Sequence, residues 1–169
     1  MRLTLFTDYA LRSLIFLGLR GEAGGRIREI AEHYAISEHH LTKVVQKLAR
    51  AGFVQTLRGR GGGLRLARAP EAIGVGDVVR ALEEDLALVE CFGPAPRCVI
   101  RRSCGLKGVL GEALAAFLAV LDRYTLADLL GPEAALRKAL RLPEPVAPCI
   151  SVPLPPAGEG RDPRKARGG

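Results

Sequence analysis

A glycine-rich basic stretch between two short apolar segments constrains the fold of this chain more than any other feature. The apolar segments are residues 53–57 and 64–66, and the sequence RGRGGG lies between them at residues 58–63. Short apolar segments on either side of a glycine-rich turn are typical of a β-hairpin. We therefore predict a two-stranded hairpin whose tip is flexible and basic.

Three helices are predicted before this hairpin. Thr7 is placed to cap a first helix over residues 8–20, and glycines follow directly after it. A second, shorter helix is expected over residues 28–34, and Ser37 is placed to cap a third that runs to about Arg50. The third helix carries apolar residues at the spacing of one buried face, namely Leu41, Val44, Val45 and Leu48.

Helix, turn, helix and then a glycine-rich basic hairpin is the order of elements in a winged helix-turn-helix. We therefore expect a mainly α fold with a small β-hairpin wing. Further along the chain we predict a short helix over residues 76–83, a cysteine-bearing loop over residues 84–104, and a long helix over residues 106–124. Proline-rich sequence beyond Leu142 predicts that the C-terminal extension, residues 131–169, is largely disordered after about residue 142.

The long helix carries an unusually wide apolar stripe. Its members are Leu106, Val109, Leu110, Ala113, Leu114, Phe117, Leu118, Leu121 and Tyr124. Such a stripe can pack on the same helix of a second copy, which would make this a dimerisation helix. It can also pack inside its own domain, and the stripe alone leaves both arrangements open.

The basic charge of the chain is concentrated in its first 70 residues. They contain 12 Lys or Arg against 5 Asp or Glu, whereas residues 71–130 contain 6 against 9. A basic N-terminal region is expected of a surface that meets nucleic-acid phosphates. The outward face of the third helix could equally be an ordinary solvated surface, but the two arginines in the hairpin tip favour binding of double-stranded DNA. The candidate DNA contacts are Ser37, His39, His40, Lys43, Lys47, Arg58, Arg60, Gly61 and Gly62.

Three cysteines in the loop, Cys91, Cys98 and Cys104, have six and five residues between them and no fourth cysteine or histidine nearby. A structural zinc site usually shows tight Cys-x-x-Cys pairs and four ligands. Three thiolates instead favour an iron–sulfur cluster whose last iron is held by a weaker ligand. Cys149 is isolated among prolines, and we expect it to be dispensable.

The sequence also limits the classes of protein to be considered. No signal-peptide pattern and no apolar run of membrane-spanning length are present, so we expect a cytoplasmic protein in which structural disulfides are disfavoured. No nucleophile–base pair or phosphate-cradling loop is evident, so we do not expect an enzyme. An iron–sulfur electron carrier and a zinc-stabilised DNA-binding protein are the alternatives from other classes.

Four motifs in order give the chain a specific resemblance. They are MRLTLFTDYALR at residues 1–12, TLRGRGGG at residues 56–63, the cysteine triad, and LDRYTLADL at residues 121–129. Together they resemble the NsrR-type nitric-oxide-sensing iron–sulfur repressors of the Rrf2 family of winged-helix transcriptional regulators. The resemblance covers about residues 1–130. It implies a DNA-binding domain over residues 1–70, and a cluster-binding loop with a dimerisation helix over residues 71–130.

The resemblance further implies a homodimer in which each cysteine loop holds a 4Fe–4S cluster. The fourth ligand would be an aspartate near the N-terminus of the other subunit, which here is Asp8. Without the resemblance, an acid in the first turn of a helix needs no metal to explain it, because the helix dipole favours it. Arg12, one turn later on the same face, and Glu83, before the loop, are expected to lie around this ligand.

The resemblance predicts a repressor that binds a near-palindromic operator and releases it when nitric oxide attacks the cluster. Related regulators respond instead to iron or to cluster supply, and this is the alternative function. In relatives that regulate cluster assembly, a histidine follows the last cysteine by three residues, and Lys107 stands there in this chain. Iron-responsive relatives resemble residues 90–92 and 103–106, whereas Asp8 favours the nitric-oxide branch.

Overall fold

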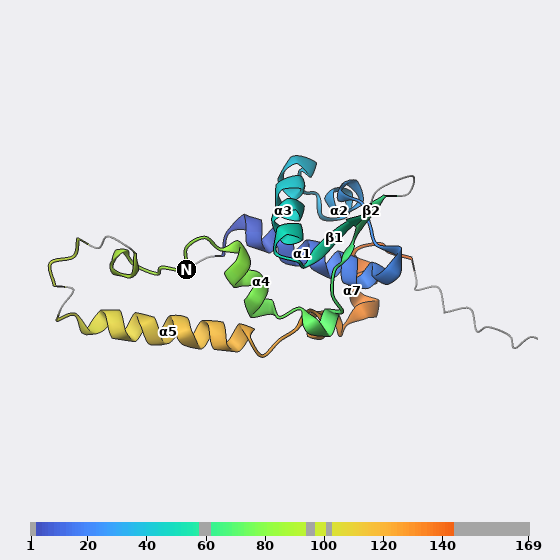
Figure 1. Cartoon of the computed structure of the whole chain (residues 1–169). Helices are drawn as coiled ribbons and strands as arrows, with labels where there is room; N and C mark the ends of the chain where they lie inside the picture. The colour runs from blue at the N-terminus through green and yellow to red at the C-terminus, as the bar shows by residue number, and fades with distance from the viewer. Residues whose placement is uncertain (1–2, 58–61, 94–96, 101–102, 144–169) are drawn as a thin grey trace, which may run out of the picture.

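The computed structural model describes residues 3–57, 62–93, 97–100 and 103–143, and it is mainly helical (Figure 1). The α-helices are α1 (Leu5–Arg20), α2 (Ile27–Tyr34), α3 (Glu38–Arg50), α4 (Val75–Leu82), α5 (Gly105–Leu121), α6 (Leu126–Leu130) and α7 (Glu133–Ala139). The strands are β1 (Val54–Leu57) and β2 (Gly63–Leu66), and the 3-10 turns are η1 (Gly21–Ala23), η2 (Pro70–Ala72) and η3 (Glu90–Phe92). The predicted fold class, helices with a hairpin wing, is confirmed.

Helices α1, α2 and α3 and the hairpin pack around one hydrophobic core. We call these elements together the head. The face predicted to be buried on α3 is buried, and it packs against apolar side chains of α1. Residues of this core with no exposed surface are Ala10, Leu14, Phe16, Leu17, Ile30, Leu41, Val44 and Leu48. Since these side chains come from all three helices, burial of their apolar surface fixes how α3 sits on α1.

The hairpin is antiparallel, with Val54 opposite Leu66 and Leu57 opposite Gly63. Its second strand also pairs with Gly25, because Leu64 donates to the Gly25 carbonyl at 2.7 Å and accepts from the Gly25 amide at 3.0 Å. The preceding Gly24 has a φ of 57°, and a Cβ there would collide with the Leu64 carbonyl. Glycine at this position therefore lets the wing join the head.

The first helix begins earlier than predicted. Thr4, not Thr7, is its cap, since the Thr4 hydroxyl accepts from the Thr7 amide at 3.3 Å. Thr7 is fully buried in the first turn, together with the more exposed Asp8. Both threonines fit the local capping pattern, and the Thr4 cap prevails because it satisfies a helix amide while Thr7 joins the core.

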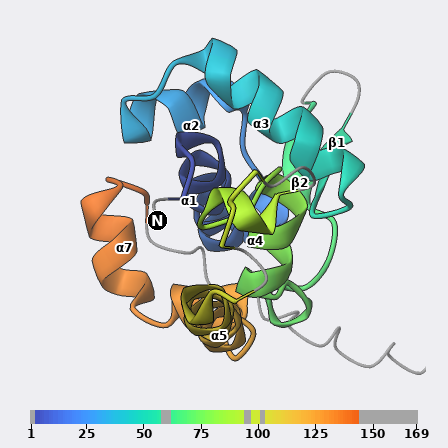
Figure 2. The same cartoon turned by 90° about the vertical axis from the view of Figure 1, so that its left-hand side faces the viewer.

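Helix α5 runs along one side of the molecule and extends beyond the head (Figures 1 and 2). Its C-terminal end is attached to α4, because Arg80 forms a bidentate ion pair with Asp122. The distance from Arg80 Nη1 to Asp122 Oδ1 is 2.6 Å. The chain then turns, and Thr125 and Asp128 form a capping box that starts α6. The predicted long helix therefore stops at Leu121, three residues before its expected end.

Residues 131–143, the first part of the predicted C-terminal extension, are part of the packed structure. Arg137 of α7 is only 7% exposed and donates to the carbonyl oxygens of Leu19 and, at 2.8 Å, Pro143. Leu140 and Leu142 are buried beside it. The residues expected to be disordered, from 144 onwards, lie outside the described part of the chain, as does Cys149.

Candidate nucleic-acid interface and cysteine loop

The outward face of α3 presents three of the predicted DNA contacts. His39, His40 and Lys43 are exposed. Ser37 is at the N-cap position with an extended backbone, and in the described residues its hydroxyl makes no capping hydrogen bond. The N-terminal end of α3 therefore offers a hydroxyl, two imidazoles and an ammonium group, which are suited to phosphates and base edges.

The wing is described only at its base. Gly62 is half-buried and leads into β2, whereas Arg58, Arg60 and Gly61 lie outside the described residues. Their predicted DNA contacts stay predictions. The wing base and α3 belong to the same head and share its core (Figure 1).

Lys47 differs from the other predicted DNA contacts. Its Nζ atom donates to the Leu82 carbonyl at 2.8 Å and lies 3.6 Å from a carboxylate oxygen of Glu84. The same atom lies 5.5 Å from the centre of the Phe6 ring. The sequence pattern placed Lys47 on an open surface, but its ammonium group is turned toward α4 because a helix carbonyl and a carboxylate satisfy it there.

The three cysteines of the loop are free thiols in different surroundings. Cys91 lies in η3 and is half-buried, Cys98 is exposed, and Cys104 is the half-buried N-cap of α5. Cys104 therefore lies at the N-terminus of a 17-residue helix. Among the described residues, no group of three Cys, His, Asp or Glu side chains lies together as a metal site within one subunit.

A hydrogen bond that the sequence did not predict connects the residues that precede two of these cysteines. A carboxylate oxygen of Glu90 accepts from the backbone amide of Arg97 at 3.0 Å. Glu90 directly precedes Cys91, and Arg97 directly precedes Cys98. The hydrogen bond therefore brings the two ends of residues 90–97 together. In the sequence, the only indication of this contact was an acidic residue next to a cysteine.

Asp8 and Arg12, which were expected to lie close together, form an ion pair. The closest oxygen–nitrogen distance is 2.8 Å, and a second contact measures 3.1 Å. Both side chains are well exposed, at 39% for Asp8 and 44% for Arg12. The Asp8 carboxylate thus lies on the surface of the head, already held in one orientation by its own helix.

Glu83 contacts a different partner from the one expected. It accepts hydrogen bonds from the amide of Thr4 at 2.8 Å and from its hydroxyl at 3.0 Å, rather than joining Asp8 and Arg12. Partial burial raises the pKa of Glu83, but hydrogen bonds from Thr7 and Thr4 and the charge of Lys47 outweigh it and hold the pKa below its ordinary value. The carboxylate therefore ties the start of the cysteine loop to the start of α1.

A winged head with an exposed, partly basic helix, joined to a long helix, defines a DNA-binding transcriptional regulator rather than an enzyme. The profile of the Rrf2 family, described as "Iron-dependent Transcriptional regulator", matches residues 3–132. The chain belongs to the Rrf2 family. None of its described helices is long and apolar enough to span a membrane.

Curated relatives support the same family. The chain is 52% identical over 147 residues to the HTH-type transcriptional regulator NsrR of Bacillus subtilis, covering 85% of this chain and 100% of that protein. It is also 52% identical over 143 residues to the NsrR of Geobacillus kaustophilus, covering 83% and 97%. The relatives are named as transcriptional regulators, which agrees with the prediction that the chain is not an enzyme.

Solved structures share the fold at lower identity. The IscR of T. potens has a TM-score of 0.64 and 29% identity, and the match covers 80% of this chain and 88% of that one. CymR, the global cysteine regulator of B. subtilis, has a TM-score of 0.62 and 29% identity, covering 76% and 95%. One of these structures is named a cysteine regulator, so the shared fold does not by itself identify the signal to which this chain responds.

Proposed function

We propose that this protein is a dimeric repressor that senses nitric oxide through a 4Fe–4S cluster and then releases its operator DNA. Each cluster would be held by Cys91, Cys98 and Cys104 of one subunit and by Asp8 of the partner subunit. The observation that carries the proposal is the set of three free thiols in one loop, at 91, 98 and 104, beside a DNA-binding head.

The donor atoms fit an iron–sulfur cluster. Thiolates are the usual ligands of such clusters, and three of them leave one iron for a harder ligand. The hydrogen bond that the Arg97 amide donates to Glu90 supports the fit because it draws the segments carrying Cys91 and Cys98 together. When bound, the cluster would supply iron to which nitric oxide binds strongly.

Asp8 is suited to reach a second subunit. Its carboxylate is exposed, and its pairing with Arg12 holds it in place before any metal is bound. Arg12 would also offset the negative charge of a cluster bound by three thiolates. These are roles for the chain's own residues: Asp8 binds, and Arg12 orients it.

The homodimer is supported by the surface of α5. No residue of this 17-residue helix is buried in a single subunit. Large apolar side chains on it are exposed, among them Leu106 at 58% and Val109 at 63%. A second copy is the occupant that buries such a face symmetrically. A two-fold dimer would place two α3 helices about one DNA turn, roughly 34 Å, apart on a near-palindromic site.

Loss of the link between the loop and the partner's Asp8 would release the constraint on the spacing of the two heads. The dimer with a loaded loop and the dimer without it would then be two states that differ in operator affinity. Nitric oxide would lower affinity by shifting the population toward the second state.

Anaerobic operator binding during a nitric-oxide titration tests this function. We expect the loaded dimer to fall to non-specific affinity, a loss of about 10³-fold or more, as the cluster reacts. Cys98→Ala should abolish cluster binding, whereas Cys149→Ala serves as the matched control and should retain it. Retention of the cluster by Cys98→Ala, or its loss in Cys149→Ala, would contradict the ligand assignment.

An iron-responsive regulator is the second candidate, favoured by the iron-dependent description of the family profile. The same titration separates the two functions. If the loaded dimer stays on the operator after complete reaction with nitric oxide and dissociates only when iron is chelated, the iron-responsive function replaces the one proposed.

A further inference from the structure

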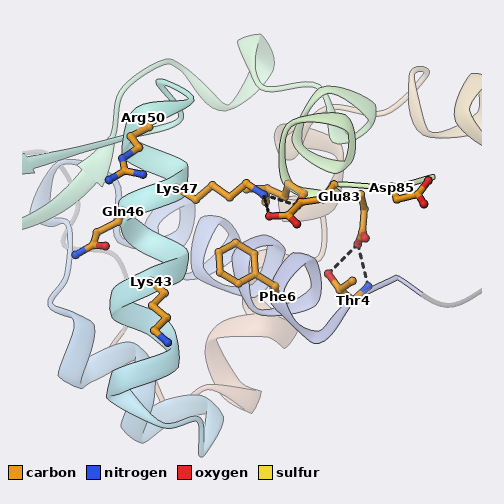
Figure 3. Close-up of a pocket in the computed structure, with 10 residues that line it drawn as sticks. Thr4, Phe6, Lys43, Gln46, Lys47, Arg50, Glu83 and Asp85 are labelled. Atoms are coloured by element: carbon orange, nitrogen blue, oxygen red, sulfur yellow. Dashed lines mark hydrogen bonds and ion pairs between the residues drawn. The ribbon is translucent and has the colours of Figure 1, made fainter. Parts of the chain in front are cut away.

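A groove of about 770 Å³ lies between α3 and the point where α4 passes into the cysteine loop. Figure 3 shows the basic side chains of α3 that line one side of it, Lys43, Lys47 and Arg50. The acidic segment 83–85 forms the other side. Of the three basic residues, Lys47 is the one that reaches across the groove, and its contacts give it a separate role.

Lys47 caps the C-terminus of α4. Leu82 is the last residue of that helix, and its carbonyl oxygen is one of those left without a partner inside the helix. The Lys47 ammonium group supplies the missing donor at 2.8 Å. A cation is favoured at this end of a helix by the dipole as well. The contact therefore joins α3 to the residue directly before the cysteine loop.

The surroundings of the Lys47 side chain hold it in this position. Its amine lies 3.6 Å from Glu84 and packs over the ring of Phe6 from α1. Only 32% of the side chain is exposed, in contrast to Lys43 one turn earlier. A lysine that contacts DNA phosphates needs its ammonium group free at the surface, and that of Lys47 is bound to the end of α4 and to Glu84.

A second connection reaches the same point of the chain. Glu83, the residue after Leu82, accepts two hydrogen bonds from Thr4, which caps α1 (Figure 3). Asp8 lies one helical turn beyond that cap. The first residues of the cysteine loop are therefore attached both to the helix that faces DNA and to the helix that carries the proposed fourth ligand.

We infer that Lys47 is a positioning residue that couples the cysteine loop to α3, and that it sets operator affinity without contacting DNA. This inference deepens the proposed function and rests on it, because the state of the loop is taken as the signal. A change at the start of the loop moves the Leu82 carbonyl, and Lys47 transmits this shift to α3. Typical coupling between sites changes affinity by about 5- to 150-fold.

The test compares Lys47→Met with Lys43→Met, a matched change on the same helix. Operator affinity is measured over a range of salt concentrations for the cluster-loaded and the cluster-free dimer. For Lys47→Met we expect the ratio between the two affinities to fall by about tenfold, with the salt slope unchanged. For Lys43→Met we expect the ratio to be kept and the slope to fall by about 0.9, the effect of one phosphate contact.

Lys47→Arg keeps a donor that can reach the Leu82 carbonyl, so it should retain most of the ratio between the operator affinities of the loaded and the cluster-free dimer. If the loss in Lys47→Met came only from poor folding, the arginine would not be expected to prevent it. A lower salt slope in Lys47→Met with an unchanged ratio would overturn the inference and make Lys47 a phosphate contact. Equal ratios in Lys47→Met and the unmodified protein would overturn it as well.

The two proposals fail in different ways. If the unmodified dimer binds no cluster, or keeps its operator in nitric oxide, the proposed function fails. The salt slope and the protection of α3 amides from hydrogen exchange in the cluster-free protein then still test Lys47. Unchanged amide exchange in Lys47→Met would show that the contact does not hold α3.

Discussion

Glu90 and Arg97 are seven residues apart in the sequence, yet the Glu90 carboxylate accepts a hydrogen bond from the Arg97 amide at 3.0 Å. Each residue directly precedes a cysteine, so the bond limits how far apart the backbone at Cys91 and Cys98 can lie. A hydrogen bond to a charged group contributes about 1.5–3 kcal/mol to stability. This one contributes less, because it is exposed to solvent.

We expect Glu90→Ala to weaken cluster binding without unfolding the head, because the loop must then be ordered by the cluster alone. Anaerobic reconstitution should give a cluster that is lost to a chelator several-fold faster than in the unmodified protein. Glu71→Ala, which removes an exposed acid far from the loop, is the control. Equal rates of loss in both variants would exclude a role for Glu90.

The pair formed by Asp8 and Arg12 gives the second prediction. Asp8→Ala should leave a cluster with an altered spectrum and an exchangeable site, and Asp8→Cys should bind it more tightly, because a thiolate is the softer ligand. Arg12→Ala should have a smaller effect of the same kind, since it removes the orienting partner only. Unchanged spectra and nitric-oxide kinetics in all three variants would remove Asp8 from the ligand set.

The third prediction concerns DNA. Arg58→Ala and Arg60→Ala should each lower affinity for operator and random DNA and reduce the salt slope by about 0.9. Changes at His39 or His40 should alter sequence preference instead, because side chains near the N-terminus of this helix reach base edges. Binding measured on operator and random DNA at several salt concentrations separates the two effects. If the histidine variants lose the same affinity for operator and random DNA, the histidines contact the DNA backbone and not the bases.

Gly76 gives the fourth prediction, which concerns the attachment of α5. A Cβ at Gly76 would overlap the Asp122 carboxylate and approach Arg80, so Gly76→Ala must displace the ion pair between them. We expect a loss of about 1 kcal/mol or less in the free energy of unfolding, because the displaced ion pair is partly exposed and alanine favours the helix. The matched test is a double-mutant cycle: in the background of Asp122→Ala the same change should cost much less. Equal costs in both backgrounds would contradict the steric explanation.

The fifth prediction follows from the lowered pKa of Glu83. A carboxyl whose pKa is lower in the folded state contributes stability above its unfolded pKa and loses it as the pH falls through the folded pKa. The stability difference between the unmodified protein and Glu83→Gln should therefore be constant from pH 7 to about pH 5 and shrink below about pH 4.3. Denaturant unfolding of the cluster-free proteins measures it. A difference that grows on acidification would show that Glu83 is not held as a carboxylate.

Much of the head could be predicted from the sequence because its signals are local. The spacing of Leu41, Val44, Val45 and Leu48 follows the helical repeat, and a glycine-rich turn between apolar segments specifies a hairpin whatever surrounds it. The pairing of Asp8 with Arg12 is equally local, since the two residues are one turn apart on one helix. The cysteine spacing likewise predicts the cluster-binding loop from a local pattern.

The tertiary structure decided the contacts that join distant segments. Lys47 fits the outward face of a helix by its spacing, but the end of α4 comes close enough to take its ammonium group. Glu83 accepts a hydrogen bond from Thr4, which is 79 residues away in the sequence. Arg137 donates one to Leu19, which is 118 residues away. Periodicity fixes which side of a helix a residue occupies, whereas its partners depend on how the whole chain packs, because hydrogen bonds and charges act only between groups that folding brings within a few ångströms.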